Sequence, residues 1–317
     1  MLYRNQISPV LIPVYDRYIH FEKVINTLSK CHNSDKTELY IYIDFAKSNQ
    51  VLECQNSILN TINDFEHKFK LINVIQRSFN MGAQDNILDA IDDLFRKYKS
   101  IIFLEDDCIV HPSFLNFLNS CLNKYADNEE ILGVSGYLYP INYPVQFGDK
   151  DIVKLPYSSA WGMGLWKSKY SRPELKSKQI LSLIKQKKIV TLLKNVSNRH
   201  HYVSLKEVFF KRDRWGDFCF MLSLLNNDKK WIFPVHTLVK NIGADGSGLH
   251  QGAYNFNIID SQILPQDLNL NFDLSEDHNL RLIFQSKIKM FFKNSLKGKI
   301  VYFFLKIWFN LAHGIPR

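Results

Sequence analysis

Three consecutive carboxylates, Glu105, Asp106 and Asp107, directly follow the apolar run Ile101–Leu104 in the segment KSIIFLEDDCIVHPSF. Carboxylates this close repel one another and stay ionised only beside a cation or good hydrogen-bond donors. In an extended segment side chains alternate, so Glu105 and Asp107 are expected on one side and Asp106 on the other. The pattern favours one carboxylate for a hard divalent cation and another for the hydroxyl groups of a sugar or ribose. A solvated turn that places negative charge before the next helix is the alternative.

Strand-like and helix-like runs alternate around this triplet. The strand-like runs are SPVLIPVY, TELYIYIDFA, FKLINVIQR and SIIFLEDD, and apolar residues at helical spacing separate them, beginning with Phe21, Val24, Ile25 and Leu28. Helices are also expected over about Val51–Phe65, over NMGAQDNILDAIDDLFRKY and over HPSFLNFLNSCLNKY. This order predicts an α/β fold, with a mixed, mostly parallel sheet flanked by helices on both faces.

Ligands of open α/β sheets bind at the carboxyl ends of the strands. Pro13, Asp44, Arg77 and the acidic triplet all lie at such ends, so we expect them to face one crevice. The alternative is that polar residues merely mark where strands stop.

The later part of the chain offers a second carboxylate. Asp217 lies in RDRWGDFCFML between Trp215 and Phe218, which could form an apolar wall for a sugar ring and raise the pKa of the acid. A carboxylate with a raised pKa could act as a general base. Asp217 could instead cap the helix that follows, and Asp213 is the next candidate base.

These segments together resemble a known family. FLEDDCIVHPSFLNF resembles the DXD region of GT-A nucleotide-sugar glycosyltransferases, in the EDD form of the N-acetylglucosaminyltransferase I type. RSFNMGAQDNILDAI is similar to the Arg/Asn-x-Gly helix start of family 2 enzymes. WGDFCFML and WIFPVHTLVKNIGADGSGLHQGAY look like the late catalytic segment of the same superfamily. The resemblance covers roughly residues 8 to 255, and the order of the motifs is more specific than any one of them.

The resemblance implies a role for each matched residue and a divalent cation, Mn²⁺ or Mg²⁺, as cofactor. Asp107 would ligate the metal ion, and Glu105 and Asp106 would contact the ribose or the donor sugar. Asp44 would read the base or ribose in a nucleotide pocket that the loop of Pro13, Arg77 and Asn80 would line. Asp217 would be the catalytic base, although Gly216 stands where a second acid often occurs.

Two further predictions concern the loops. His250 lies in GSGLHQG, and many GT-A enzymes use a late histidine as a further metal ligand, although a lone loop histidine is more often simply exposed. Trp161 and Trp166 surround two glycines in SSAWGMGLW and, with Trp215, are expected to stack on donor or acceptor sugar. Tryptophans of the core are the alternative.

The charge is concentrated at one end. The 317-residue chain has a net charge of +9, but eight of its lysines and arginines follow Asp277, its last acid, and leave 32 basic and 31 acidic residues elsewhere. A nucleic-acid-binding face is therefore disfavoured. The tail mixes these cations with apolar residues at helical spacing, and we expect a basic amphipathic helix at an anionic membrane surface. A helix packed on the body of the protein or on a second subunit is the alternative. The expected division is residues 1–132 for the donor, 133–277 for the acceptor and catalysis, and 278–317 for the tail.

Five scattered cysteines without CxxC spacing favour a reducing compartment and argue against zinc, and the N-terminus lacks the apolar core of a signal peptide. We therefore expect a cytoplasmic protein, peripheral at the inner face of the membrane. The function expected is an inverting glycosyltransferase that moves sugar from a nucleotide diphosphate to a glycan or lipid-linked acceptor of a surface polysaccharide. A nucleotidyltransferase is the first alternative, but it needs a glycine-rich loop after the first strand, and PVYDRYIHFEK has no glycine. A non-catalytic glycan-binding or assembly subunit is the second.

Overall fold

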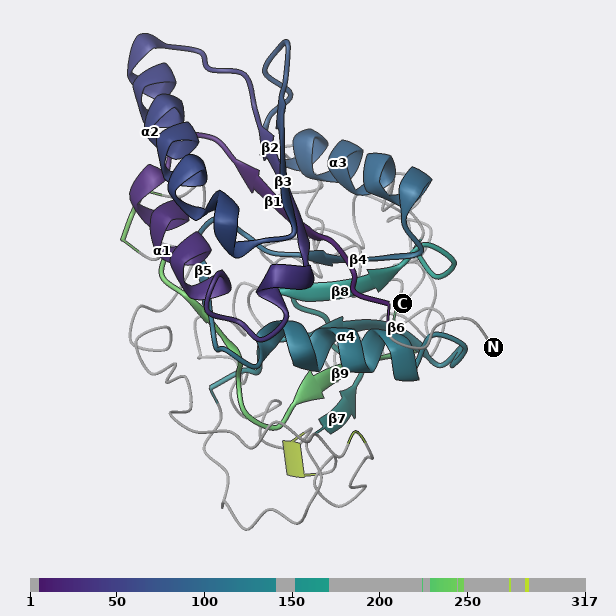
Figure 1. Ribbon diagram of the computed structural model, residues 1–317. Helices are drawn as coiled ribbons and strands as arrows, with labels where there is room; N and C mark the ends of the chain where they lie inside the picture. Colours follow the sequence, from purple (N-terminus) through teal and green to yellow (C-terminus); the bar gives the residue numbers. More distant parts are fainter. Residues whose placement is uncertain are drawn as a thin grey trace, which may run out of the picture.

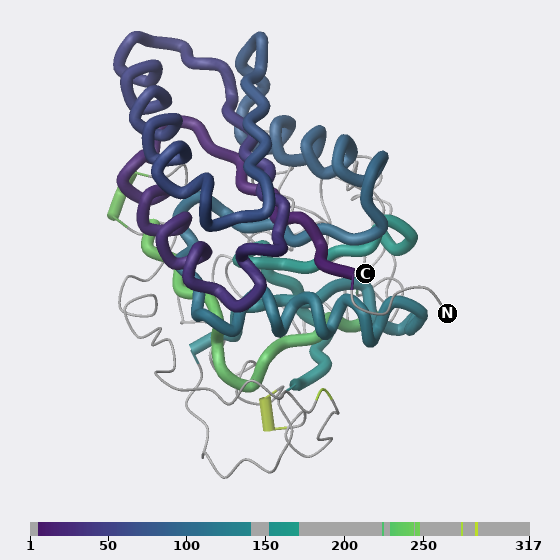
Figure 2. Tube along the Cα trace, in the orientation of Figure 1, coloured from purple at the N-terminus to yellow at the C-terminus, as the bar shows by residue number. Residues whose placement is uncertain are grey.

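The computed structural model describes residues 6–140, 152–170, 224, 229–243, 245–247, 274 and 283–284 (Figures 1 and 2). The helices are α1 (Tyr18–Leu28), α2 (Asn49–Phe65), α3 (Ala83–Lys97) and α4 (Phe114–Lys124), with short 3₁₀ turns η1 (Ser34–Lys36) and η2 (Glu66–Lys68). The strands are β1 (Val10–Val14), β2 (Glu38–Ile43), β3 (Leu71–Gln76), β4 (Ser100–Phe103), β5 (Cys108–Val110), β6 (Ile131–Ser135), β7 (Ile152–Leu155), β8 (Met163–Trp166), β9 (Lys230–Pro234) and β10 (Val239–Asn241).

The described strands form one sheet of eight strands and one of two. The large sheet has the order β3-β2-β1-β4-β8-β6-β9-β7, and β5 pairs with β10 in the small one. β3, β2, β1 and β4 are mutually parallel, and so are β6 and β9. β8 runs antiparallel to both of its neighbours, β4 and β6, and β7 runs antiparallel to β9. The expected mixed, mostly parallel sheet is confirmed.

The alternation of β1 explains why helices cover both faces of this sheet. Val10, Ile12 and Val14 point into one apolar core, which is completed by buried residues of α1, α2 and α4. Leu11 points the other way, into a second core with buried residues of α3. A strand whose side chains are apolar on both faces of the sheet has to be covered on both sides. Figure 1 shows α1 and α2 together at one side of β1–β3, with α3 at the other.

The helices bury the residues that their apolar spacing predicts. α1 buries the four residues named above for its helical pattern. α2 begins after Ser48, whose side chain accepts a hydrogen bond of 3.3 Å from the amide of Val51, as an N-cap residue does. α3 begins after Gly82, whose φ of 79° favours glycine.

One expectation is modified by the structure. β4 ends at Phe103, and the acidic triplet forms a turn in which the amide of Cys108 donates to the carbonyl of Glu105 at 3.2 Å. The expected extended alternation of the three acids is therefore wrong. The expected boundary at residue 132, between two halves of one domain, falls within β6, and strands on both sides of it share one sheet. The roles of the two halves remain predictions.

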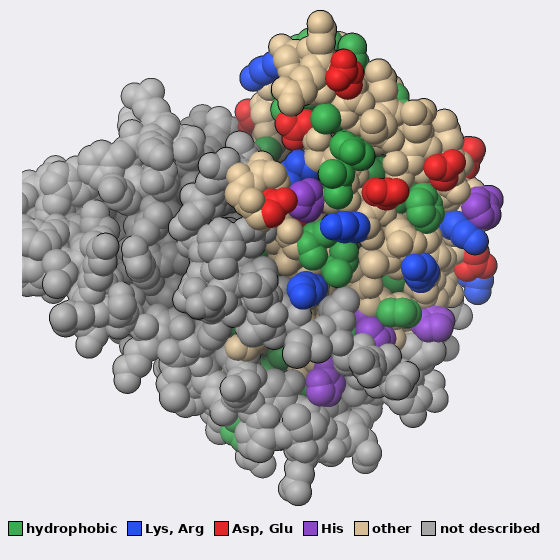
Figure 3. All heavy atoms as spheres, turned by 90° about the vertical axis from the view of Figure 1, so that its left-hand side faces the viewer, with side chains coloured by type: hydrophobic (Ala, Val, Ile, Leu, Met, Phe, Trp, Pro, Cys, Tyr) green, Lys and Arg blue, Asp and Glu red, His purple; other side chains and the backbone are tan. Residues whose placement is uncertain are grey.

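The surface gives little support to a nucleic-acid face on the side of α1 and α2. Figure 3 shows acidic and basic side chains interspersed among the described residues of that side. Within the described part of the chain, no helix is long and apolar enough to span a membrane. The predicted tail lies outside the described residues except for 283–284.

Candidate active site

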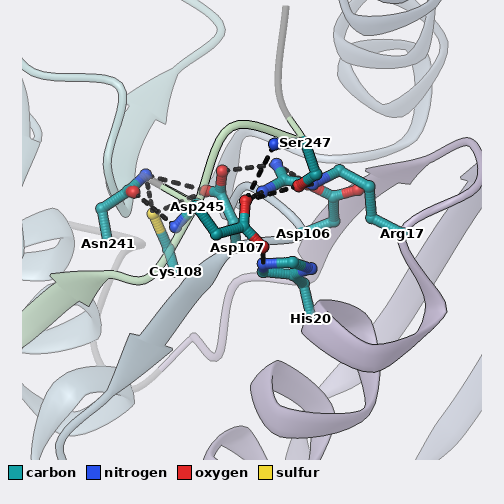
Figure 4. Close-up of polar contacts among 9 residues, drawn as sticks. Arg17, His20, Asp106, Asp107, Cys108, Asn241, Asp245 and Ser247 are labelled. Carbon is teal, nitrogen blue, oxygen red and sulfur yellow. Dashed lines mark hydrogen bonds and ion pairs between the residues drawn. The ribbon is translucent and has the colours of Figure 1, made fainter. Parts of the chain in front are cut away.

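The acidic triplet lies at the carboxyl end of β4, beside the carboxyl end of β1, because β1 and β4 are parallel neighbours. The chain beyond β1 supplies the counter-charge. Arg17 donates a hydrogen bond of 2.7 Å from Nη1 to Oδ2 of Asp107, and the same nitrogen is 3.6 Å from Oδ1 of Asp106 (Figure 4). The side chains of Arg17 and Asp107 are only 14% and 12% exposed. The requirement for a cation beside the acids is thus met within the chain itself.

The second oxygen of Asp107 is held by the late part of the chain. Asn241 at the end of β10 donates from Nδ2 to Asp107 Oδ1 at 2.8 Å, and its own Oδ1 accepts from the amide of Gly243 at 2.9 Å. The β5–β10 pairing places Asn241 opposite Cys108, and the amide of Ile242 donates to the carbonyl of Asp107 at 2.8 Å. The segment at and just after the end of β10 therefore lies against the acidic turn.

A short segment beyond Gly243 closes over Arg17. Ser247 accepts a hydrogen bond of 3.1 Å from Nε of Arg17, and Asp245 lies 3.9 Å from its Nη2. His20 on α1 places Nε2 3.1 Å from the other oxygen of Asp245. Among the described residues, Nη2 of Arg17 is one of a few buried side-chain nitrogens without a hydrogen-bond partner.

The electrostatics of this cluster follow from burial and mutual proximity. Burial, and next the charge of Asp107, raise the pKa of Asp106 to about 7. Burial opposes the charge of Arg17, but the two carboxylates outweigh it and raise the Arg17 pKa. Burial, and next the charge of Arg17, lower the pKa of His20. A guanidinium that keeps its charge therefore lies beside the two carboxylates.

The residues fit a hard divalent cation in part. Ligand atoms of Glu105, Asp107 and Cys108 all lie within 4.8 Å of one another. Within the described residues, these three form the cluster whose side chains could together hold a metal ion. Burial raises the pKa of the Cys108 thiol well above its usual value, so the thiol stays protonated and is a poor ligand. The carboxylate oxygens of Glu105 and Asp107 are the ligands that Mg²⁺ and Mn²⁺ prefer. Both oxygens of Asp107 already accept hydrogen bonds from Arg17 and Asn241.

Asp44 lies at the end of β2, as expected, but its carboxylate is occupied. It is 3% exposed and accepts hydrogen bonds from the amides of Phe45 (2.9 Å), Met81 (2.8 Å) and Gly82 (2.9 Å). Asp44 therefore fixes the start of α3 to the end of β2. Its role in reading a base or ribose stays a prediction.

The other expected donor-site residues lie at the same edge of the sheet. Arg77 follows β3 and is bound to α3, donating to Oδ1 of Asn86 at 2.8 Å and pairing with Asp89 at 2.8 Å. Asn80 donates to the carbonyl of Phe45 at 2.8 Å, which joins the loops after β3 and β2. Pro13 lies within β1, opposite Tyr42 of β2, so the expected loop at Pro13 is wrong and the strand continues to Val14. Their contacts with a nucleotide remain predictions.

Two of the described tryptophans, Trp161 and Trp166, were expected to stack on a sugar, and they differ. Trp166 is 1% exposed, its Nε1 donates to the carbonyl of Leu122 at 2.9 Å, and Lys169 lies 3.9 Å above its ring. Trp166 is therefore a core residue, and its expected role in sugar stacking is wrong. Trp161 is partly buried and packs edge-on against Tyr137, with ring centroids 4.7 Å apart. Its stacking on a sugar stays a prediction.

Three expected site residues, Asp217, His250 and Trp215, lie outside the described residues. Sequence reasoning missed Arg17 and Asn241, which contact Asp107 directly. The signal for Arg17 was available, because it follows β1 at the same edge and three acids need a cation. Asn241 had no local signal, since only the β5–β10 pairing brings it to the site.

No protein-family model matches the chain, and no curated protein sequence matches it either. Among solved structures, the chain is similar to residues 1–349 of S. aureus TarS, with 10% identity, a TM-score of 0.40 and coverage of 72% of this chain and 58% of that one. It is also similar to the mannosyltransferase PcManGT from Pyrobaculum calidifontis in complex with GDP-Man and Mn²⁺, with 10% identity, a TM-score of 0.37 and coverage of 71% and 70%. A third similar structure is glucosyl-3-phosphoglycerate synthase from Mycobacterium tuberculosis in complex with Mn²⁺ and UDP, with 16% identity, a TM-score of 0.30 and coverage of 41% and 43%. The chain thus spans less than two thirds of the length of the first and third of these distant likenesses.

Proposed function

We propose that this chain is a divalent-cation-dependent glycosyltransferase that moves a sugar from a nucleotide diphosphate to an acceptor hydroxyl. The observation that carries the proposal is the meeting of a buried carboxylate, Asp107, and a buried guanidinium, Arg17, at the carboxyl ends of two parallel strands. This edge is where open α/β sheets bind nucleotides. A site with both signs of charge suits a ligand that combines an anionic diphosphate with a polar sugar.

Each residue then has a part in the reaction. Glu105 and Asp107 would hold the cation, which when bound supplies positive charge to stabilise the departing diphosphate. Arg17 lies beside Asp107, and Asn241 keeps Asp107 in position. Asp106 accepts sugar or ribose hydroxyls, and Asp217 takes the acceptor proton during transfer with inversion.

The finer part of the proposal concerns the acceptor. The basic, aromatic tail after Asp277 supports an enzyme that works at an anionic membrane surface, on the inner face, where it meets a lipid-linked glycan of a surface polysaccharide. Flotation of full-length and tail-deleted protein with anionic vesicles tests this part. We expect only the full-length protein to float, and equal behaviour of the two proteins overturns the membrane role.

The test of the main proposal is a thermal-shift screen of nucleotide sugars with and without Mn²⁺, followed by a transfer assay. A true donor stabilises the folded protein by mass action, and we expect this shift to depend on Mn²⁺. Asp107→Asn keeps the size of the side chain and should lose the Mn²⁺-dependent part of the shift. A screen in which no nucleotide sugar stabilises the wild type overturns the proposal, and stabilisation without transfer or hydrolysis favours the glycan-binding alternative.

A further inference from the structure

Arg17 already occupies the charge-neutralising position at the carboxylate that the proposed function assigns to the metal ion. Its Nη1 is 2.7 Å from Asp107 Oδ2 and 3.6 Å from Asp106 Oδ1, in a pair that is largely shielded from solvent. Figure 4 shows Asp107 between Arg17 on one side and Asn241 on the other. A cation that approaches Asp107 therefore meets a carboxylate that a guanidinium has already neutralised.

The surroundings restrict how the two cations could share Asp107. Oδ1 accepts from Asn241 at 2.8 Å, and the thiol of Cys108 lies 3.6 Å from the same oxygen. On the other side, a single methyl group added at Gly243 would lie 2.0 Å from Asp107 Oδ2 and 2.6 Å from Nη2 of Arg17. The backbone of Gly243 thus leaves no room for a side chain beside the ion pair. A divalent ion bound to Oδ2 would therefore lie close to the guanidinium. Two positive charges that both contact the same carboxylate oxygen repel strongly, because solvent screens them little there.

Movement of Arg17 is also connected to the 245–247 segment. The same guanidinium that binds Asp107 donates from Nε to Ser247 at 3.1 Å and lies 3.9 Å from Asp245. Asp245 is 48% exposed at its side chain and has His20 at 3.1 Å as a further partner on α1. Displacement of Arg17 from Asp107 would therefore remove or weaken its hydrogen bond to Ser247 and its contact with Asp245, and would leave Ser247 bonded to Asp245.

We infer that Arg17 is a resident cation that competes with the divalent metal ion for Asp107, and that their exchange releases the 245–247 segment from the acidic turn. This inference rests on the proposed function, because it assumes that Asp107 is a metal ligand. Arg17 then sets how tightly the metal ion binds and couples metal binding to the cover of the site.

The first test measures Mn²⁺ affinity directly, without activity, from the electron paramagnetic resonance signal of free Mn²⁺ during titration. We expect Arg17→Gln to bind Mn²⁺ roughly ten-fold more tightly than the wild type, since a like charge beside the ion is removed. Arg96→Gln is the matched control, because Arg96 is 74% exposed on α3 and pairs with Asp93 away from the site. It removes the same charge and should leave the affinity unchanged. The double variant Arg17→Gln/Asp107→Asn should lose the gain.

The outcomes separate this inference from the proposed function. Equal or weaker Mn²⁺ binding by Arg17→Gln, with the wild type binding measurably, overturns the competition and leaves the proposed metal site standing. Absence of Mn²⁺ binding in both proteins overturns the metal site and the competition together, while donor binding can still be measured.

A second test uses the unaltered chain and so does not depend on the folding of a variant. Hydrogen exchange of peptides that cover residues 241–247 is compared with and without saturating Mn²⁺. We expect faster exchange in the part of these peptides that contains residues 245–247 when Mn²⁺ is bound, because the segment then loses its hydrogen bond with Arg17. Unchanged or slower exchange in this segment overturns the coupling.

Discussion

The side-chain amide of Asn241 donates a 2.8 Å hydrogen bond to Oδ1 of Asp107 across the β5–β10 pair. Both residues are buried, so Asn241→Ala leaves this carboxylate oxygen with only the weak thiol donor of Cys108 and should cost about 1–3 kcal/mol of unfolding free energy. Asn241→Asp should cost more, because it places a second carboxylate at that oxygen. Urea denaturation measures both.

A control for these two variants is Asn123→Ala. Asn123 donates 3.1 Å to the neutral carbonyl of Gln6 from the partly exposed side of α4, so its loss should cost only about 1 kcal/mol. If the variants of Asn241 and Asn123 lost the same unfolding free energy, the hydrogen bond to Asp107 would contribute no more stability than one to a neutral carbonyl.

Gly243 is expected to be intolerant of any side chain. The methyl group of Gly243→Ala would lie 2.0 Å from Asp107 Oδ2, so either the ion pair or the backbone has to move, at about 1–3 kcal/mol. Gly164→Ala is the control, since a methyl there would meet only side-chain atoms of Leu122 at 3.2 Å, which can shift. We expect Gly243→Ala alone to change Mn²⁺ affinity as well as stability. Unaltered Mn²⁺ binding in a destabilised Gly243→Ala would show that the ion does not sense the Arg17–Asp107 pair.

Asp44 should prove a structural residue whatever it does toward a ligand. Its carboxylate accepts three backbone amide protons, and Asp44→Asn turns an NH₂ group toward at least one of these donors. The loss should be about 1–3 kcal/mol of unfolding free energy. The exposed Asp64→Asn on α2 serves as control and should unfold like the wild type. An Asp44→Asn protein of wild-type stability would contradict the three hydrogen bonds.

The first half of the fold could be predicted because its signals are local. The spacing of apolar residues in α1 and the two-sided apolar pattern of β1 are written in consecutive residues, and each element formed where they indicated. The insertion of β8 between β4 and β6 could not be predicted in this way. It depends on antiparallel pairing of segments about 60 residues apart, such as Ile101 with Leu165, and no short pattern encodes that choice.

The site shows the same division between local and distant information. Asp107 could be predicted as a site residue, because three adjacent acids in consecutive positions are visible in the sequence itself. Arg17 and Asn241 are single residues of ordinary type, and only tertiary structure brings them to Asp107. Trp166 was misassigned because a tryptophan between glycines looks alike whether it faces a sugar or, as here, the backbone of α4.

The polar cluster at the start of β2 predicts a contribution to acid stability. Glu38 accepts hydrogen bonds from Lys70 at 2.7 Å and from Tyr98, and the bond from Lys70 is the largest cause that lowers the Glu38 pKa. As the pH falls below 4.5, the usual pKa of the group, the unfolded chain binds a proton before the folded one does. The stability that Glu38 contributes is therefore complete above that pH and is lost as the pH falls further.

Glu38→Gln should flatten this part of the pH dependence, as measured by urea denaturation across the acid range. Lys70→Gln, which removes the main partner of Glu38, should flatten it in part. Because Glu38 starts β2 and the acidic turn lies at the opposite ends of the strands, both variants should keep wild-type Mn²⁺ affinity at neutral pH. If Glu38→Gln lost as much stability at low pH as the wild type, other carboxylates would have to cause this pH dependence.

Asp217 should separate donor binding from transfer. In the proposed reaction it meets only the acceptor hydroxyl, so Asp217→Asn should keep the Mn²⁺-dependent thermal shift with donor while transfer falls by about 10²-fold or more. Asp213→Asn is the matched control four residues earlier in RDRWGDF and should retain transfer. Full activity in Asp217→Asn together with a loss in Asp213→Asn would move the base to Asp213. If Asp217→Asn lost the thermal shift with donor, Asp217 would instead be a structural residue. A base that contacts only the acceptor should not affect the binding of the donor.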